Sequence, residues 1–272
     1  MKPLPRPSWD AASDFDAIVA TKHSAAKRVL TQVRQAVHLA IGRYLDQAPH
    51  LENFRGGTPT PEQRTALLEC FESGRRTNSC KAMLARLELK RCPLCGVDTA
   101  KTFDHYLPKS LFPELVVCAY NLIHVCHRCN SARGDDWLGK HGRSTLHLYY
   151  DEIETQEPLL EAEVAISKDG PCARFRVNAT LDAPGFAGRF ARHCEALDLV
   201  EVFEGCASAM LLDIVDDLRG QELDIPQVQA ALEHSAMKRG ERHGANHWEA
   251  ALRRGIARSN TFIVYALNGG EA

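Results

Sequence analysis

The sequence predicts an α+β fold that is mainly helical, with a cysteine-rich module at its centre and a small β-hairpin after it. Apolar residues recur at helical intervals over long stretches on both sides of the centre. Two C-x-x-C pairs stand thirty residues apart in the middle, and apolar and polar residues alternate in two short segments around a turn. We therefore expect a helical region over residues 1–74, a central module over 75–143 and an α+β accessory region over 144–272.

Size and composition are those of a soluble globular protein. The 272 residues can bury a sizeable core, and 44% apolar with 25% charged residues is ordinary for that class. No apolar run reaches the ~18 residues that a membrane helix needs, and the first ten residues lack the apolar segment of a secretory signal. We expect no membrane segment and a cytoplasmic location.

Ten cysteines are many for a cytosolic chain, and four of them form the C-x-x-C pairs. The other six stand singly, mostly among apolar residues. This favours small buried hydrophobic side chains in a reducing compartment over a disulfide framework. These six are Cys70, Cys80, Cys118, Cys172, Cys194 and Cys206.

Helices should fill the N-terminal region. Apolar residues recur at helical spacing from about Asp14 to Tyr44, which predicts either one long helix or two helices broken near Thr21–Ser24. The segment from Pro49 to Pro61 contains the run GGTPTP and should be a loop.

A capping box predicts where the next helix begins. Thr60 stands before Pro61, which suits the first helical position, and Gln63 follows three residues after the threonine. This helix should run to about Glu72 and end at 73–74. A second helix, over about 78–89, leads into the central module.

A β-hairpin opens the accessory region. Residues 161–166 and 172–177 alternate apolar and polar side chains around the turn 168–171. Residues 261–267 are apolar enough to be a final strand or a buried helix end, and both readings stay open. Helical segments are expected between these two parts, at 185–199, 206–220, 227–239 and 247–259.

The two C-x-x-C pairs can close one tetrahedral zinc site. They are Cys92 with Cys95 and Cys126 with Cys129. A redox dithiol is one alternative, but a redox pair needs no matched second pair. Unrelated buried cysteines are the other. Four thiolates leave no open position on the ion, so zinc here would be structural.

Local sequence supports zinc. Gly96 follows Cys95, where a tight turn that points backbone amides at sulfur needs a residue tolerant of positive φ. In the second pair we expect Cys126 on a turn and Cys129 at the start of a helix that begins near Asn130.

The order of polar residues around these pairs resembles the HNH endonucleases, whose core is a ββα-metal finger. The resemblance covers residues 90–136, about one sixth of the chain. The run FDHYLPKSLFPE is most similar to the HNH nuclease component of bacterial antiphage defence operons, such as the Septu type. The matching positions, in order, are Asp104, His105, Pro108, Asn121, Leu122, Cys126, Cys129 and Asn130.

This resemblance implies a role for each polar residue. His105 would be the general base that takes a proton from the attacking water, because an imidazole group ordinarily has a pKa near neutrality. Asp104 and Asn130 would give oxygen ligands to Mg²⁺ or Mn²⁺, which would neutralise the leaving 3′ oxygen. Asn121 would hold the loop that bears the histidine without touching substrate. The expected products carry 5′-phosphate and 3′-hydroxyl ends.

Two details of this motif set conditions on the site. Many family members have histidine in place of Asn130, so softer ions should bind less well here. Neighbouring residues on a strand point to opposite faces, so Asp104 and His105 can converge only if the strand ends or bulges there. Pro108 agrees with strand pairing that stops soon afterwards.

Charge is distributed as in a protein that contacts phosphate. From Arg75 to Arg143 there are twelve Lys/Arg and six Asp/Glu, within a chain of net charge −2. Duplex DNA is favoured over RNA because no aromatic-interleaved RNA-recognition sequence is present. Lys109, Arg128 and Arg133 are the candidate nucleic-acid contacts.

Two clusters in the accessory region are weaker candidates. His243 and His247 could share one helical face, but Gly244 weakens that helix and the spacing is not that of a metalloprotease motif. An arginine group could extend a DNA surface or dock a partner, although solvated arginines are the simpler interpretation. It consists of Arg253, Arg254 and Arg258.

The sequence therefore predicts a metal-dependent HNH endonuclease that cuts DNA, with structural Zn²⁺ and catalytic Mg²⁺ or Mn²⁺. Three alternatives stay open. The chain could be a zinc-finger DNA-binding module without catalysis, or an HNH nuclease that acts on RNA. It could also be a nuclease that is silent until a partner ATPase of a defence complex activates it.

Overall fold

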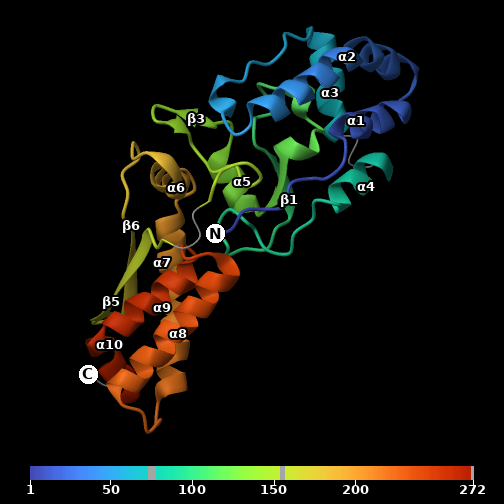
Figure 1. The fold of residues 1–272 in the computed structure, drawn as a ribbon. Coiled ribbons are helices and arrows are strands. Elements are labelled where there is room, and N and C mark those ends of the chain that lie inside the picture. The colour runs from blue at the N-terminus through green and yellow to red at the C-terminus, as the bar shows by residue number, and fades with distance from the viewer. Residues whose placement is uncertain (73–77, 154–156, 271–272) are drawn as a thin grey trace. The chain divides into compact units, whose positions relative to one another are not determined.

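The computed structural model describes residues 1–72, 78–153 and 157–270, and it confirms a mainly helical α+β class with small antiparallel hairpins (Figure 1). The chain forms two compact units. One is Pro3–Asp151, and the other is Met1–Lys2 with Glu152–Ala272. The first unit takes in the helical region and the central module expected from the sequence, together with residues 144–151.

Two helices open the first unit: α1 (Ala11–Ala20) and α2 (Ser24–Gln47). This confirms the alternative of two helices with a break. Asp10 caps α1 by accepting hydrogen bonds from the next turn, and at the other end the Thr21 hydroxyl donates to the Ile18 carbonyl at 2.7 Å. Because that hydroxyl and the Thr21 amide both use carbonyls of the last turn, α1 ends there.

The predicted capping box is present at α3 (Pro61–Glu72). The Gln63 amide donates to Thr60 Oγ1 at 3.3 Å, and the Thr60 amide donates to Gln63 Oε1 at 3.0 Å. The expected stop at 73–74 lies outside the described residues. The next helix, α4 (Asn78–Ala85), ends about one turn earlier than expected.

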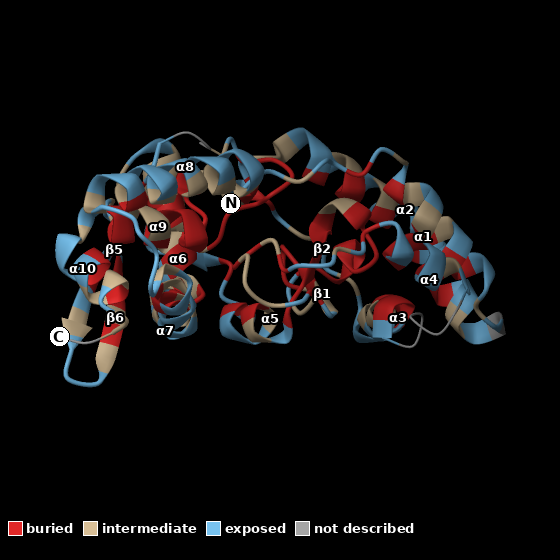
Figure 2. Cartoon of the chain, turned by 90° about the horizontal axis from the view of Figure 1, so that it is seen from below, coloured by how far each residue is buried: buried red, intermediate tan, exposed pale blue. Residues whose placement is uncertain are grey.

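One face of α2 supplies much of the core of this unit. Its buried residues recur at three- and four-residue spacing, which turns one stripe of the helix inward. Figure 2 shows this mixture of buried and exposed ribbon along α2. The buried residues of α2 are Val29, Leu30, Val33, Val37, Ala40, Ile41 and Tyr44.

The central module is a hairpin followed by a short helix. Strand β1 (Thr102–His105) pairs antiparallel with β2 (Leu122–Val125), and the register runs from Thr102 opposite Val125 to His105 opposite Leu122. Helix α5 (His127–Arg133) follows β2 directly and contacts β1. The rest of the module consists of the 3-10 turns η3 (Pro113–Leu115) and η4 (Ala119–Asn121) and the two-residue strands β3 (Leu138–Gly139) and β4 (Gly142–Arg143).

The second unit packs helices on a hairpin. As predicted, β5 (Leu160–Ser167) and β6 (Gly170–Val177) pair through a tight turn. Helix α9 (Trp248–Arg258) packs on β5, and α7 (Leu199–Leu218) packs on β6. The final apolar segment is a helix, which settles the alternative left open by the sequence. The helices are α6 (Gly185–Ala196), α7 (Leu199–Leu218), α8 (Ile225–His243), α9 (Trp248–Arg258) and α10 (Asn260–Leu267).

Gly255 lets α9 lie close to β5. A Cβ atom at this position would come within 2.4 Å of the Ala162 carbonyl oxygen, so any larger residue would push the helix away from the strand. A glycine in the middle of a helix costs stability, and the close approach explains its presence here.

Most of the single cysteines are core residues. Cys70, Cys80, Cys118 and Cys194 are buried, whereas Cys172 and Cys206 are partly exposed. Within the described ranges, no helix has both the length and the apolar character needed to cross a bilayer.

Candidate metal and catalytic site

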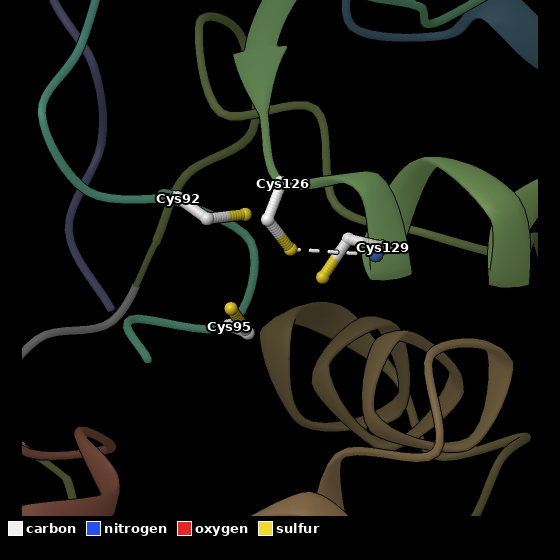
Figure 3. A group of neighbouring side chains, drawn as sticks. All are labelled: Cys92, Cys95, Cys126 and Cys129. Carbon is white, nitrogen blue, oxygen red and sulfur yellow. Dashed lines mark hydrogen bonds between the residues drawn. The ribbon is translucent and has the colours of Figure 1, made fainter. Parts of the chain in front are cut away.

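The four cysteines of the two pairs form one buried cluster. Their sulfurs all lie within 4.8 Å of one another, and Figure 3 shows them turned toward a common centre. Four sulfurs bound tetrahedrally at about 2.3 Å from zinc are about 3.8 Å apart, so the cluster needs little movement to bind the ion. The four residues can therefore hold a structural zinc ion.

The first pair sits on a tight turn. The Gly96 amide donates to the Cys92 carbonyl at 2.9 Å, with φ of 69° at the glycine. The next amide, of Val97, donates to the Cys95 sulfur at 3.4 Å. Gly96 thus has the positive φ expected from the sequence, and the turn points a backbone amide at a ligand sulfur.

The second pair forms the first turn of α5. Cys126 is the N-cap residue, and its sulfur accepts the Cys129 amide at 3.4 Å, drawn as the dashed line in Figure 3. The helix begins at His127, earlier than the start expected near Asn130. The reason is that Cys126 has extended backbone geometry and acts as the cap itself, so the C-x-x-C pair lies within the helix start.

The close approach of the sulfurs shifts the pKa values of the cysteines in opposite directions. Hydrogen bonds from Cys129 and then from Cys92 hold the pKa of Cys95 far below its ordinary value. Hydrogen bonding to Cys92 and Cys95 raises the pKa of Cys129. A dication at the centre would replace these shared protons, because zinc binds the thiolate form.

Two of the candidate nucleic-acid contacts have partners within the protein. Arg128 lies beside the cluster, where its guanidinium contacts the Cys129 sulfur and an Asp98 oxygen, both at 3.4 Å. Lys109 forms an ion pair with Glu72 at 2.6 Å. Both side chains keep about a third of their surface exposed, at 33% and 38%. They therefore remain able to meet a ligand from solvent.

Asp104 is buried near the end of β1 and paired with a cation. Its Oδ2 accepts from Arg133 Nη1 at 2.7 Å, and the two side chains are 8% and 1% exposed. Burial raises the pKa of Asp104 despite the opposing effect of Arg133. The strand ends at His105; the sequence required that it either end or bulge at this point for Asp104 and His105 to converge.

His105 is held by a backbone carbonyl and an aromatic ring. Its Nε2 lies 2.8 Å from the Val116 carbonyl oxygen, and its ring meets Phe71 edge-on with centroids 4.6 Å apart. A carbonyl oxygen only accepts, so Nε2 must carry the proton in this contact. In the neutral ring, Nδ1 then holds the lone pair.

Asn121 ties the start of β2 to the loop that follows His105. Its Oδ1 accepts the Leu107 amide at 2.7 Å, and its Nδ2 donates to the Leu107 carbonyl at 3.0 Å. The Asn121 carbonyl also accepts the Tyr106 amide at 2.8 Å. Asn121 is fully buried, so it contacts backbone and not solvent.

Arg133 is an interior residue, although the sequence suggested a phosphate contact. Besides Asp104, it donates to the His105 carbonyl at 2.8 Å, the Tyr106 carbonyl, and Thr145 Oγ1 at 3.2 Å. It is 2% exposed as a residue, and its guanidinium also lies over the Tyr106 ring. The last turn of α5 faces β1, which turns this arginine inward.

Asp104 and His105 therefore point to different partners. Asp104 faces α5, on which Asn130 stands three residues before Arg133 and so lies on the same side of the helix. His105 faces Val116 and Phe71. The structure brings Asp104 to the helix that bears Asn130, and it directs the histidine ring elsewhere, as alternation along a strand requires.

A buried polar network lies behind the hairpin, and the sequence analysis did not find it. Tyr106 donates its hydroxyl to the Thr145 carbonyl at 2.9 Å and accepts from Arg143 at 2.8 Å. Arg143 pairs with Asp151 at 2.6 Å, and that carboxylate accepts the His147 amide. Two members of the network, His147 and Asp151, lie in the run LHLYYDE. This run alternates apolar and polar residues as a strand does, but it forms turns in the structure, and these two residues are buried.

The weaker candidates in the second unit do not form a metal site. The rings of His243 and His247 lie 4.8 Å apart, but among the described residues only the four cysteines bring enough ligand atoms together. Arg253 donates to Ser235 and Arg254 donates to the Leu160 carbonyl. Arg258 is exposed.

Comparison with known proteins gives one partial likeness. The chain is similar to protein ea31 of Escherichia phage lambda, at 32% identity over 65 residues, which is 23% of this chain. That match spans 22% of the length of ea31. No family model and no solved structure matches the chain.

Proposed function

We propose that this chain is a metal-dependent HNH endonuclease that hydrolyses DNA phosphodiester bonds. The contact of His105 Nε2 with the Val116 carbonyl carries the proposal. A general base needs a nitrogen with a lone pair and a fixed ring, and this contact supplies both. His105 would take the proton of the attacking water on Nδ1.

Oxygen ligands for a divalent cation lie on the strand that bears His105 and on the helix that contacts it. Asp104 on β1 and Asn130 on α5 stand on facing elements that the Arg133 ion pair joins. These are the oxygen donors that Mg²⁺ and Mn²⁺ prefer. Such a cation would supply charge stabilisation at the scissile phosphate and the leaving oxygen.

The cysteine cluster supports the site mechanically. It joins the turn at Cys92–Cys95 to the start of α5, so that β2 and α5 are fixed at their junction. Four sulfur ligands leave no position for water, so the ion they hold is structural. By the HNH resemblance, a hairpin and helix joined in this way would carry the catalytic residues.

The resemblance and the charge distribution support the substrate and setting that we propose. Residues 75–143 carry twelve Lys/Arg against six Asp/Glu, which favours contact with a phosphate backbone. We place the nuclease in antiphage defence, and a nuclease that is silent until a partner ATPase activates it is the alternative. The helical regions on both sides of the central module lie outside the HNH motif. They would provide the surface that binds this partner.

A plasmid-nicking assay tests the proposal directly. The wild-type protein should convert supercoiled plasmid to open circles with Mg²⁺ or Mn²⁺ and not with EDTA. His105→Ala should lower the rate by about 10²- to 10⁴-fold, the usual contribution of a general base, while DNA binding and zinc content stay unchanged. His50→Ala is the matched control, because that histidine side chain is 78% exposed and lies outside the motif.

The results separate three outcomes. Cleavage that survives in His105→Ala removes this residue as the base. Parallel incubation with total RNA detects a nuclease whose substrate is RNA. Full activity of the purified chain alone would remove the need for an activating ATPase.

One observation favours a second candidate, a DNA-binding module without catalysis. The carboxylate of Asp104 is already buried and paired with Arg133, as in a purely structural ion pair. Such a module would bind plasmid DNA and shift it in a gel, yet would never nick it with any divalent cation. The same assay distinguishes it from the nuclease.

A further inference from the structure

We propose that Arg133 is a positioning residue that fixes the Asp104 carboxylate in place for a divalent cation. This inference rests on the proposed function, because it assigns the cation to Asp104 and Asn130. It gives a role to a buried arginine that is not among the positions at which the sequence matches the HNH motif.

The contacts of Arg133 converge on the end of β1. Nη1 donates to both Asp104 Oδ2 at 2.7 Å and the His105 carbonyl at 2.8 Å. Nη2 donates to the Tyr106 carbonyl. One side chain thus holds three consecutive residues, and two of them are the proposed ligand and the proposed base.

The fourth contact anchors the guanidinium itself. Nε donates to Thr145 Oγ1 at 3.2 Å, and the guanidinium lies 5.2 Å from the centre of the Tyr106 ring. Five N–H donors in a rigid plane can serve a carboxylate, two carbonyls and a hydroxyl together. Lysine keeps the charge but lacks this fork, so it cannot replace the arrangement.

The ion pair does not use every acceptor position of Asp104. A carboxylate offers about four, of which Arg133 takes one on Oδ2 and the His105 amide takes another. Asn130 stands three residues before Arg133 on the same helix, which puts it on the side of α5 that carries Arg133. Groups that orient metal ligands in this way commonly set the affinity for the ion.

Direct binding of Mn²⁺ in the absence of DNA tests the inference. Free Mn²⁺ can be followed by its electron paramagnetic resonance signal, with zinc content and near-ultraviolet circular dichroism as measures of folding. Arg133→Lys should weaken Mn²⁺ binding by about 10- to 100-fold, the usual effect of losing a residue that orients a ligand. Arg133→Gln should weaken it at least as much, and Asp104→Asn should abolish it.

Arg143→Lys is the matched control. It disturbs the buried Arg143–Asp151 pair and keeps the contacts between Arg133 and Asp104, so Mn²⁺ affinity per folded molecule should stay at the wild-type value. A merely structural role of Arg133 would instead give Arg133→Lys and Arg143→Lys the same effect on the ion.

Each remaining outcome is decisive. Wild-type Mn²⁺ affinity in Arg133→Lys, with binding lost in Asp104→Asn, overturns the role of Arg133 and leaves the proposed function intact. Loss of zinc and of the near-ultraviolet signal in both Arg133 variants shows a purely structural residue and also overturns it. If the wild-type chain neither binds Mn²⁺ nor nicks DNA, the inference and the proposed function fail together.

Discussion

The cysteine cluster and the end of β1 lie in one compact unit and hold their side chains by different means. The cluster gathers four chemically identical ligands from two local turns, and backbone amides of the same turns support them. The end of β1 presents a carboxylate and an imidazole whose partners come from α5, from α3 and from the loop at Val116. A site built from local turns is robust and easy to recognise, whereas a site built from distant partners depends on the whole fold.

Removing the zinc ligand that caps α5 should give the largest effect. Cys126→Ser should lose the ion and unfold the central module, because structural zinc contributes on the order of 10 kcal/mol in small metal-dependent folds. Metal analysis and thermal unfolding would measure this, with Cys118→Ser as a comparison that disturbs a buried cysteine outside the cluster. Unchanged zinc content in Cys126→Ser would show that the sulfurs do not share an ion.

The link made by Asn121 should come next. Asn121→Ala leaves the buried amide and carbonyl of Leu107 without partners, which should cost roughly 2–4 kcal/mol of unfolding free energy. Nicking should fall as well, since the loop after His105 is released. Asn121→Asp keeps the acceptor for the Leu107 amide but turns a second oxygen toward the Leu107 carbonyl, so it should recover part of the stability in urea unfolding only at acidic pH, where the carboxyl is protonated and can donate. No gain of Asn121→Asp over Asn121→Ala on acidification would contradict this account of the contacts.

Acid should weaken the polar network behind the hairpin through His147. Burial, with repulsion from Arg143, lowers the pKa of this histidine well below 6.5. The unfolded chain therefore binds a proton below pH 6.5 that the folded chain refuses. Above that pH, His147 takes nothing from the unfolding free energy. Below it, the unfolding free energy falls by about 1.4 kcal/mol per pH unit until the folded chain also binds the proton.

His147→Gln isolates this effect. Urea unfolding of both proteins between pH 7 and pH 5 should show that the unfolding free energy falls more steeply in the wild type. Release of zinc by acid would affect both proteins equally, so it cancels in the difference between the two slopes. Parallel pH dependences would show that His147 is protonated in the folded chain as well.

The smallest loss of stability is expected at the capping box of α3, which belongs to neither site. Thr60→Ala removes the side-chain half of the capping box of α3 and should cost about 1 kcal/mol. Nicking per folded molecule should stay at the wild-type rate. A large loss of activity in this variant would mean that α3 is coupled to the hairpin more strongly than its own cap suggests.

Local rules account for what the sequence predicted well. The capping box at Thr60, the turn at Gly96 and the β5–β6 hairpin each depend on residues a few positions apart, so their geometry follows from short-range sequence. The four cysteines belong to the same class, since each pair occupies one turn and only the pairing between turns is long-range.

Long-range packing accounts for what the sequence could not give. Arg133 looked like a phosphate contact because basic residues near a nuclease motif usually face solvent, and only the packing of α5 on β1 turns it inward. Val116 has no chemistry that marks it as the partner of His105, since it contributes a backbone carbonyl. The run at 146–150 alternates like a strand, but its residues follow turns that bury His147 among tyrosines.

Cys126 is both the cap of α5 and a proposed zinc ligand, and this double position would connect the two proposed metals. Helix α5 has seven residues, too few to persist in water by itself, and its first turn is made by the sulfurs. If the cluster holds zinc as proposed, the ion would stabilise the segment with Asn130, and zinc would then tighten binding of the proposed second cation by the same factor as that cation tightens zinc. Zinc supply would then act as an on-switch for the hydrolytic centre.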